Sequence, residues 1–156
     1  MKYVKSVLFL FLCINLLSCR FFAVGSYPYT EYYKLDLTRD SLIVKLNHLK
    51  EIHSNLKVYT IDENDMQKEL SEGSIGSTFW SANYHLNDGT IILCVINMSD
   101  QIENRPSYLG LVGLSKDNRS TWKDINTKDL SHQENKKVKK MFEEEILDNL
   151  GEWEHK

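Results

Sequence analysis

Residues 78–98 read TFWSANYHLNDGTIILCVINM, and this stretch decides the fold class. Two runs rich in aromatic and β-branched residues flank Asn87-Asp88-Gly89. An Asp-Gly pair between two such runs is a strong signal for a β-hairpin. If Asp88 and Gly89 form a two-residue turn, Asn87 lies opposite Thr90, and every other pair of partners follows from this one. The sequence therefore predicts an antiparallel hairpin whose two faces can be assigned.

That register predicts one apolar face, which is expected in the core, and one mixed face. The apolar face holds Trp80, Ala82, Tyr84, Leu86, Ile91, Leu93 and Val95. Because surfaces that bind partners often combine polar and apolar groups, the mixed face is the candidate interaction face. An alternative is that the N-terminal segment or the loop over residues 62–77 covers it. The mixed face holds Ser81, Asn83, His85, Ile92, Cys94 and Ile96.

Two amphipathic helices are expected on either side of the hairpin in the sequence. The first spans about 38–54, because Thr38 is a suitable N-cap and apolar residues recur behind it at helical spacing. The second spans about 132–150, where Ser131 and Glu134 match a capping box and Gly151 follows as a suitable C′ residue.

Further strands are expected at residues 107–115, 120–125 and 56–61, and the glycines of the first allow close approach of aromatic neighbours. The acidic stretch 62–77 is expected to be a loop, with one helical turn at 65–70. Short links between successive strands favour an antiparallel meander. The predicted fold class is α+β: a two-layer sandwich in which four or five strands carry both helices on one face, with the other face partly open.

The first eighteen residues have the pattern of a signal peptide. Lys2 and Lys5 precede an apolar run over residues 7–17, interrupted only by Asn15, which is too short to cross a bilayer of about 30 Å. The sequence Leu16-Leu17-Ser18-Cys19 resembles the bacterial lipobox, whose cysteine is acylated and becomes the mature N-terminus. An alternative is that the apolar run is a buried helix or strand.

The lipobox resemblance implies cleavage before Cys19 and an anchor of diacylglycerol and a fatty acyl chain such as palmitate on that residue. More than one acyl chain is needed for stable anchoring, and an acylated lipoprotein cysteine supplies them. The expected organisation is a signal peptide over 1–18, a lipidated N-terminus and tether over 19–36, and a single globular domain over 37–156. Extended, that tether reaches about 60 Å, with its tyrosines docked at the domain's edge.

The numbers of cysteines and of charged residues decide whether a disulfide is possible and whether nucleic acid is a suitable partner. With Cys13 removed and Cys19 acylated, Cys94 is the only thiol of the mature chain, so no internal disulfide is expected. Loss of Lys2 and Lys5 leaves seventeen basic residues against twenty-two acidic ones, a net charge of about −5. An acidic domain offers no electrostatic footprint for nucleic acid, so this class of partner is excluded.

No catalytic, phosphate-binding, dinucleotide-binding or metal-binding motif occurs, so no catalytic residue, metal or cofactor is expected. One arrangement keeps an enzyme open as an alternative. In the predicted register Cys94 and His85 are diagonal neighbours on the mixed face, about 7–8 Å apart between backbones, and Asn83 lies opposite Cys94. A small envelope enzyme would use this pair as nucleophile and base, whereas a buried thiol would be inert.

The order of features along the chain resembles small uncharacterised lipoproteins of the Bacteroidota. That resemblance implies an envelope location and no particular activity. In that lineage surface export goes with acidic residues after the lipidated cysteine, and Arg20-Phe21-Phe22-Ala23 departs from this rule. The features are the lipobox, a tyrosine-rich segment, the Asp40-Ser41-Leu42-Ile43 helix, the aromatic hairpin, a glycine-rich strand, and Trp122-Lys123-Asp124-Ile125-Asn126 ahead of Glu134-Asn135-Lys136.

We therefore expect a lipoprotein on the outer membrane that faces the periplasm. The predicted role is a non-enzymatic binding or protein-interaction module with an envelope protein as its partner. A protector or immunity-type lipoprotein is a further alternative, because such proteins are often single acidic domains.

Overall fold

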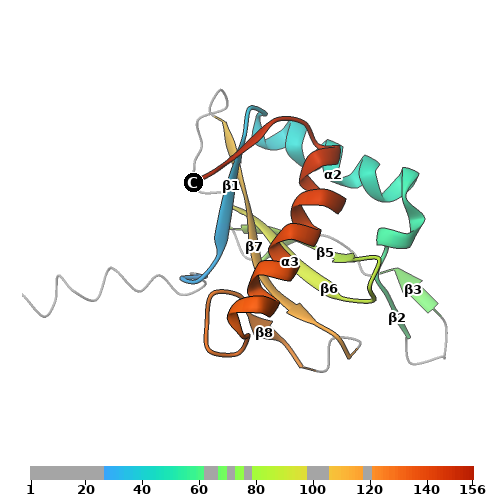
Figure 1. The fold of residues 1–156 in the computed structure, drawn as a ribbon. Helices are drawn as coiled ribbons and strands as arrows, with labels where there is room; N and C mark the ends of the chain where they lie inside the picture. Colours follow the sequence, from blue (N-terminus) through green and yellow to red (C-terminus); the bar gives the residue numbers. More distant parts are fainter. Residues whose placement is uncertain (1–26, 62–66, 70–72, 76–78, 98–105, 118–120) are drawn as a thin grey trace, which may run out of the picture.

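The computed structural model describes residues 27–61, 67–69, 73–75, 79–97, 106–117 and 121–156. The predicted signal peptide, Cys19 and the tether as far as residue 26 lie outside these described residues. An antiparallel sheet with two helices against it makes up most of the described chain (Figure 1). The predicted α+β class is therefore confirmed.

The main sheet has seven strands, more than the four or five expected, in the order β4-β5-β6-β7-β1-β9 with β8 also paired to β7. Strands β4, β5, β6 and β7 are consecutive both in the sequence and in the sheet, so they form the predicted meander. The last strands join from distant parts of the chain, since β1 pairs with β7, and β9 pairs with β1. The strands are β1 (Glu31–Leu35), β4 (Gly73–Ile75), β5 (Phe79–His85), β6 (Ile91–Asn97), β7 (Ser107–Ser115), β8 (Lys123–Asp124) and β9 (Trp153–His155).

Three predicted boundaries are wrong. Strand β1 lies inside the stretch 19–36 that was expected to be a tether, so the domain begins before residue 37. The expected loop 62–77 contains β3 (Gln67–Glu69) and β4, and β3 occupies the place of the helical turn expected at 65–70. The strand expected at 56–61 is shorter, β2 (Tyr59–Ile61), and pairs with β3 in a separate two-stranded sheet.

The hairpin between β5 and β6 forms, but its register differs by one residue from the prediction. Its loop has three residues instead of two, because the Leu86 N–H donates to the Thr90 carbonyl at 2.8 Å. Gly89 has a φ of +84°, the left-handed conformation that closes a three-residue hairpin loop. A one-residue shift moves one strand's side chains to the opposite face relative to its partner. Trp80 now pairs with Ile96, Ala82 with Cys94 and Tyr84 with Ile92.

Both helices begin where their caps predict. In α2 (Arg39–Ile52), the Thr38 side chain accepts from the Ser41 N–H. In α3 (His132–Glu145), Ser131 and Glu134 form the reciprocal capping box. The second helix ends before the predicted residue 150, because a 3₁₀ turn, η2 (Leu147–Asn149), follows it and buries the last apolar residues of the stripe. Another 3₁₀ turn of the same length, η1 (Ser54–Leu56), follows α2.

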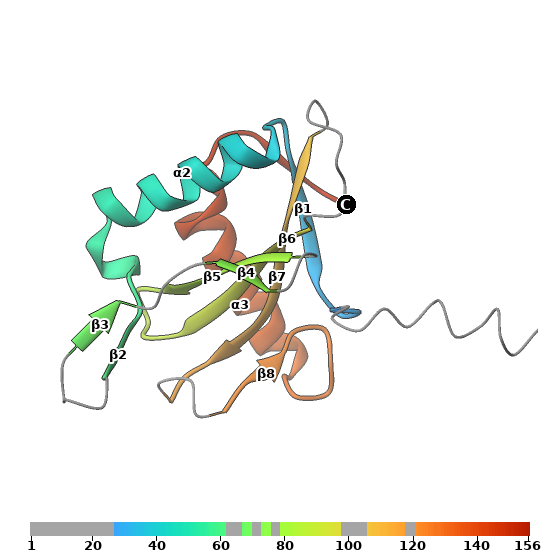
Figure 2. The same ribbon diagram turned by 180° about the vertical axis from the view of Figure 1, so that it is seen from behind.

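The main core lies between the helices and one face of the sheet, which confirms the two-layer arrangement. Both helices and the strands β1, β5, β6 and β7 contribute buried residues to this one cluster. In the view from behind, α3 lies behind the sheet (Figure 2). We call the face of the sheet away from the main core the open face. It has a smaller apolar cluster of its own, formed by Phe79, Val95 and Val112, with Tyr27 and Leu93 packed against it.

Candidate functional site

The six residues predicted to share an interaction face lie on two different faces of the sheet. Ser81, Asn83 and His85 are half-buried on the open face. Ile92, Cys94 and Ile96 are buried on the other face, where they belong to the main core. The predicted interaction face is therefore not a single surface, and the shifted hairpin register is the reason.

The same shift separates the pair that an enzyme would need. Cys94 is fully buried and lies opposite Ala82 on the core face, while His85 points to the open face opposite Ile91. A thiolate and an imidazole on opposite faces of one sheet cannot exchange a proton directly. The arrangement expected for a cysteine nucleophile at position 94 is therefore not formed.

The first described residue of the chain, Tyr27, packs on the open face. The Tyr27 ring packs edge-on against Phe79 with a centroid distance of 5.4 Å. Tyr27 thus packs on β5, the neighbour of the edge strand β4, and four residues later Glu31 pairs with β7. The described part of the chain therefore begins on this face, where Tyr27 and the half-buried Leu93 pack against the same cluster.

One end of the open face carries a group that we call the tyrosine–lysine cluster, made of Tyr32, Lys34, Tyr108 and Lys156. The pairing of Lys34 with Tyr108 in β1 and β7 puts these two side chains on one face. The Lys156 ammonium lies 4.5 Å from the centroid of the Tyr108 ring and 5.7 Å from that of Tyr32. Lys34 also forms an ion pair with Glu154 at 3.3 Å. A cation over two aromatic rings is a stabilising arrangement, and this one stays accessible from outside the fold.

A second group of charged residues lies on the opposite side, where β1 and β9 meet α3. Lys139 binds the Glu31 carboxylate at 2.7 Å, and the buried Tyr33 hydroxyl donates to Glu143 at 3.1 Å. His155 lies between the two carboxylates, 3.7 Å from Glu31 and 3.5 Å from Glu143. These contacts join the C-terminal strand to the second helix, so we assign the group a structural role.

The pKa values in this group follow from burial and from its charges. Burial and then the nearby Glu143 carboxylate raise the pKa of Tyr33, which stays a neutral hydrogen-bond donor. Partial burial on its own raises the pKa of Glu31. Hydrogen bonds from Lys139 and Asn126, with the charge of Lys139, outweigh that effect and hold the pKa of Glu31 below its usual 4.5.

We expect Glu31→Gln to lower the free energy of unfolding at pH 7 by about 1–2 kcal/mol, because it removes charge-assisted hydrogen bonds at a partly buried site. A carboxylate with a lowered pKa contributes stability above pH 4.5 and loses it as the pH falls through its folded pKa. The difference between wild type and variant should therefore shrink below about pH 4.5. Urea titrations of both proteins at several pH values measure this difference in the free energy of unfolding.

The matched control is Glu154→Gln, which removes a carboxylate from an ion pair whose glutamate side chain is 71% exposed. Exposed pairs contribute about 0–1 kcal/mol, so this change should have little effect at any pH. A Glu31→Gln variant as stable as wild type at pH 7 would contradict the structural role of this group.

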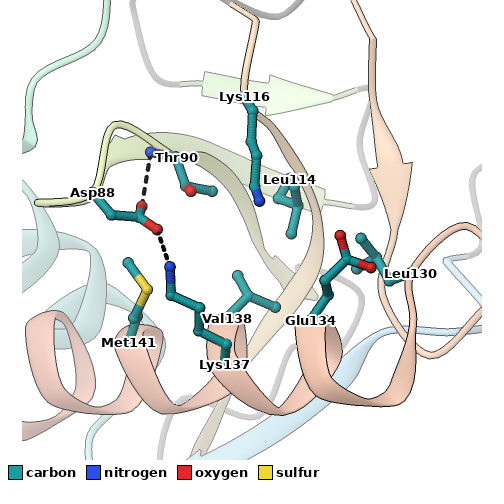
Figure 3. A pocket seen from close by; sticks show the side chains of 9 residues that line it. All are labelled: Asp88, Thr90, Leu114, Lys116, Leu130, Glu134, Lys137, Val138 and Met141. Carbon is teal, nitrogen blue, oxygen red and sulfur yellow. Dashed lines mark hydrogen bonds and ion pairs between the residues drawn. The ribbon is translucent and has the colours of Figure 1, made fainter.

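The hollow drawn in Figure 3 lies between the tip of the hairpin and α3. An ion pair of 2.8 Å between Asp88 and Lys137 closes one side, and the Thr90 N–H donates to Asp88 at 3.0 Å. Burial alone raises the pKa of Asp88, but these hydrogen bonds outweigh it, so the pKa lies below its usual value. The cavity volume of about 30 Å³ has room for only one or two water molecules. The hollow is therefore too small to be a ligand site. Its apolar lining comes from Leu114, Leu130, Val138 and Met141.

Within the described part of the chain, no three His, Cys, Asp or Glu side chains are grouped so that they could hold a metal ion. No helix among the described residues is long and apolar enough to cross a membrane. Comparisons with known protein families, with curated proteins and with solved structures find no match.

Sequence reasoning did not find the tyrosine–lysine cluster. A local signal was present, since Glu31-Tyr-Tyr-Lys-Leu35 alternates in the manner of a strand with Tyr32 and Lys34 on one side. Their partners Tyr108 and Lys156 are far along the chain, and no short-range pattern indicates that β1 lies between β7 and β9.

Proposed function

We propose that the protein is a lipoprotein anchored through Cys19, on the periplasmic side of the outer membrane, and that its domain is a non-enzymatic binding or interaction module. The lipobox-like Leu16-Leu17-Ser18-Cys19 and the preceding signal-peptide pattern support the anchor. The open face, which includes Ser81, Asn83 and His85, is the interaction surface in this proposal.

One observation carries the choice of this face. Tyr27 packs on Phe79 in the apolar cluster of the open face, and it lies only eight positions after Cys19. An anchored chain would therefore hold this face near its membrane and near other envelope components. The half-buried Leu93 and the polar residues of β5 present the combination of apolar and polar groups that partner surfaces have.

The test is photocrosslinking in the living cell, with the full chain produced in a bacterial host. Benzoylphenylalanine in place of Leu93 should give one reproducible adduct with an envelope component, either protein or lipid. The matched control puts the same residue at Val44, which is 66% exposed on α2. An equal yield at both positions, or none from position 93, would overturn the open face as the interaction surface.

A further inference from the structure

We propose that the partner of the open face is the bilayer that carries the anchor, and that the tyrosine–lysine cluster rests on lipid headgroups. This inference depends on the proposed acylation of Cys19. It goes further than the proposed function because it names the partner and orients the domain on the membrane.

The tether between the acylated cysteine and the domain is short. Tyr27 is docked on the domain, so only residues 20–26 separate the anchored residue from it. Eight steps along an extended chain cover at most about 29 Å, roughly half the reach expected when the tether was predicted to run to residue 36. The domain would therefore be held at the membrane surface.

The tether joins the domain on the open face, at Tyr27. Tyr27 packs against the apolar cluster of Phe79, Val95 and Val112, and all of these lie on the open face. A short connection that starts there brings this face toward the bilayer more readily than the helical side. On the helical side, the chain would have to pass around the edge of the sheet and use up much of its reach.

The side chains of the tyrosine–lysine cluster have the chemistry of a membrane interface. Tyrosine and lysine side chains suit the boundary between headgroups and acyl chains, because each combines an apolar body with a polar end. The Lys156 ammonium lies over the rings of Tyr108 and Tyr32, where it can meet a lipid phosphate without leaving them. On this face the Lys34 ammonium is paired with Glu154, and Lys156 contributes a second ammonium over the Tyr108 ring. A lysine ammonium in this position can form a charge-assisted hydrogen bond with the phosphate of a lipid headgroup.

The experiment uses the full chain, produced and processed in a bacterial host, with benzoylphenylalanine in place of Tyr108. After irradiation of the membranes, mass spectrometry of the purified protein identifies the adduct. We expect a phospholipid adduct at least fivefold more abundant than the one from the Val44 position. A second probe in place of Lys156, an exposed residue that lies on the Tyr108 ring, should give the same result.

Two further variants test the physical causes separately. Lys34→Glu with Lys156→Glu should reduce the phospholipid adduct at position 108 at least fivefold, because the charge that attracts the headgroup is reversed. A flexible Gly/Ser insertion of about twenty residues between Gly25 and Ser26 should reduce it to the level of the Val44 control, because the domain is then no longer held at the surface.

The outcomes distinguish this inference from the proposed function. A phospholipid adduct that depends on the short tether supports both. A protein adduct without phospholipid at positions 108 and 156, on an acylated chain, overturns the membrane contact and leaves the interaction module standing. An equal phospholipid yield at positions 108 and 44 also overturns the membrane contact. A chain that carries no acyl group overturns the anchor and this inference together.

Discussion

Phe142→Ala should lower the free energy of unfolding by about 3–5 kcal/mol, the largest effect that we expect from a single substitution in this fold. Phe142 is fully buried at the centre of the main core. Its ring lies 5.4 Å from the Tyr33 ring, so it joins α3 directly to β1, the strand between β7 and β9. Truncation to alanine removes the transfer free energy of the ring and leaves a cavity that rigid neighbours cannot fill.

Domains of this size are stable by about 5–15 kcal/mol, so the loss is a large fraction of the total. Urea unfolding followed by far-ultraviolet circular dichroism measures it. Lys140→Ala is the matched control on the same helix, because the Lys140 side chain is 70% exposed and its pair with Glu144 contributes only about 0.3–0.5 kcal/mol. A cost below about 1 kcal/mol for Phe142→Ala would contradict the packing of α3 on this face of the sheet.

Gly113→Ala should destabilise the domain by about 1–3 kcal/mol, through a clash between backbones. A Cβ at position 113 would lie 2.7 Å from the carbonyl oxygen of Lys123, a backbone atom that cannot rotate away. Gly113 pairs with Asp124 at the point where β8 joins β7. The added methyl group would push β8 off the sheet and weaken the hydrogen bond of 3.1 Å from the Ile125 N–H to the Val112 carbonyl.

Gly73→Ala is the control, because a Cβ at that position meets no atom within 4 Å and the backbone is not in the left-handed region. It should be neutral, or stabilising by up to about 1 kcal/mol through a less flexible unfolded chain. Hydrogen exchange should also be faster at the Ile125 amide in Gly113→Ala and unchanged in Gly73→Ala. Equal stabilities for the two variants would mean that β8 does not approach β7 as closely as the structure has it.

Several elements could be predicted because their signals are local. The cap at Thr38 and the capping box at Ser131 each satisfy backbone N–H groups within one helical turn, so a few residues are enough to identify them. The hairpin itself was found in the same way from Asp88-Gly89. Gly110 also behaves as expected for a glycine that admits an aromatic neighbour, since an added Cβ would lie 2.8 Å from the Tyr32 ring.

The register of the hairpin was wrong for a physical reason. The run from Ile91 to Ile96 is apolar at every position, so alternation cannot tell which of its side chains face the core. The loop length then decides the register, and two-residue and three-residue loops both use a glycine at position 89. The hydrogen bond from Leu86 to Thr90 settles this point, and it is not visible in the residue types.

The predicted interaction face was assigned from that register, so the wrong register also made the predicted face wrong. Half of the predicted interaction residues are in the core, and the tyrosine–lysine cluster was missed because its strands are distant in sequence. The tether was overestimated for a related reason. Whether the segment with Tyr32 and Tyr33 is a linker or a strand depends on β7 and β9, which supply its hydrogen bonds.

The central claim is the lipid anchor, and intact-mass measurement tests it most directly. Wild-type protein and a Cys19→Ser variant are purified from the membranes and soluble fraction of a bacterial host that processes lipoproteins. We predict a wild-type mass that corresponds to cleavage before Cys19 plus diacylglycerol and acyl groups, and no such mass in the variant. An unmodified mass of 18.2 kDa for the wild type would contradict the anchor, and residues 7–17 would then have to be part of the fold.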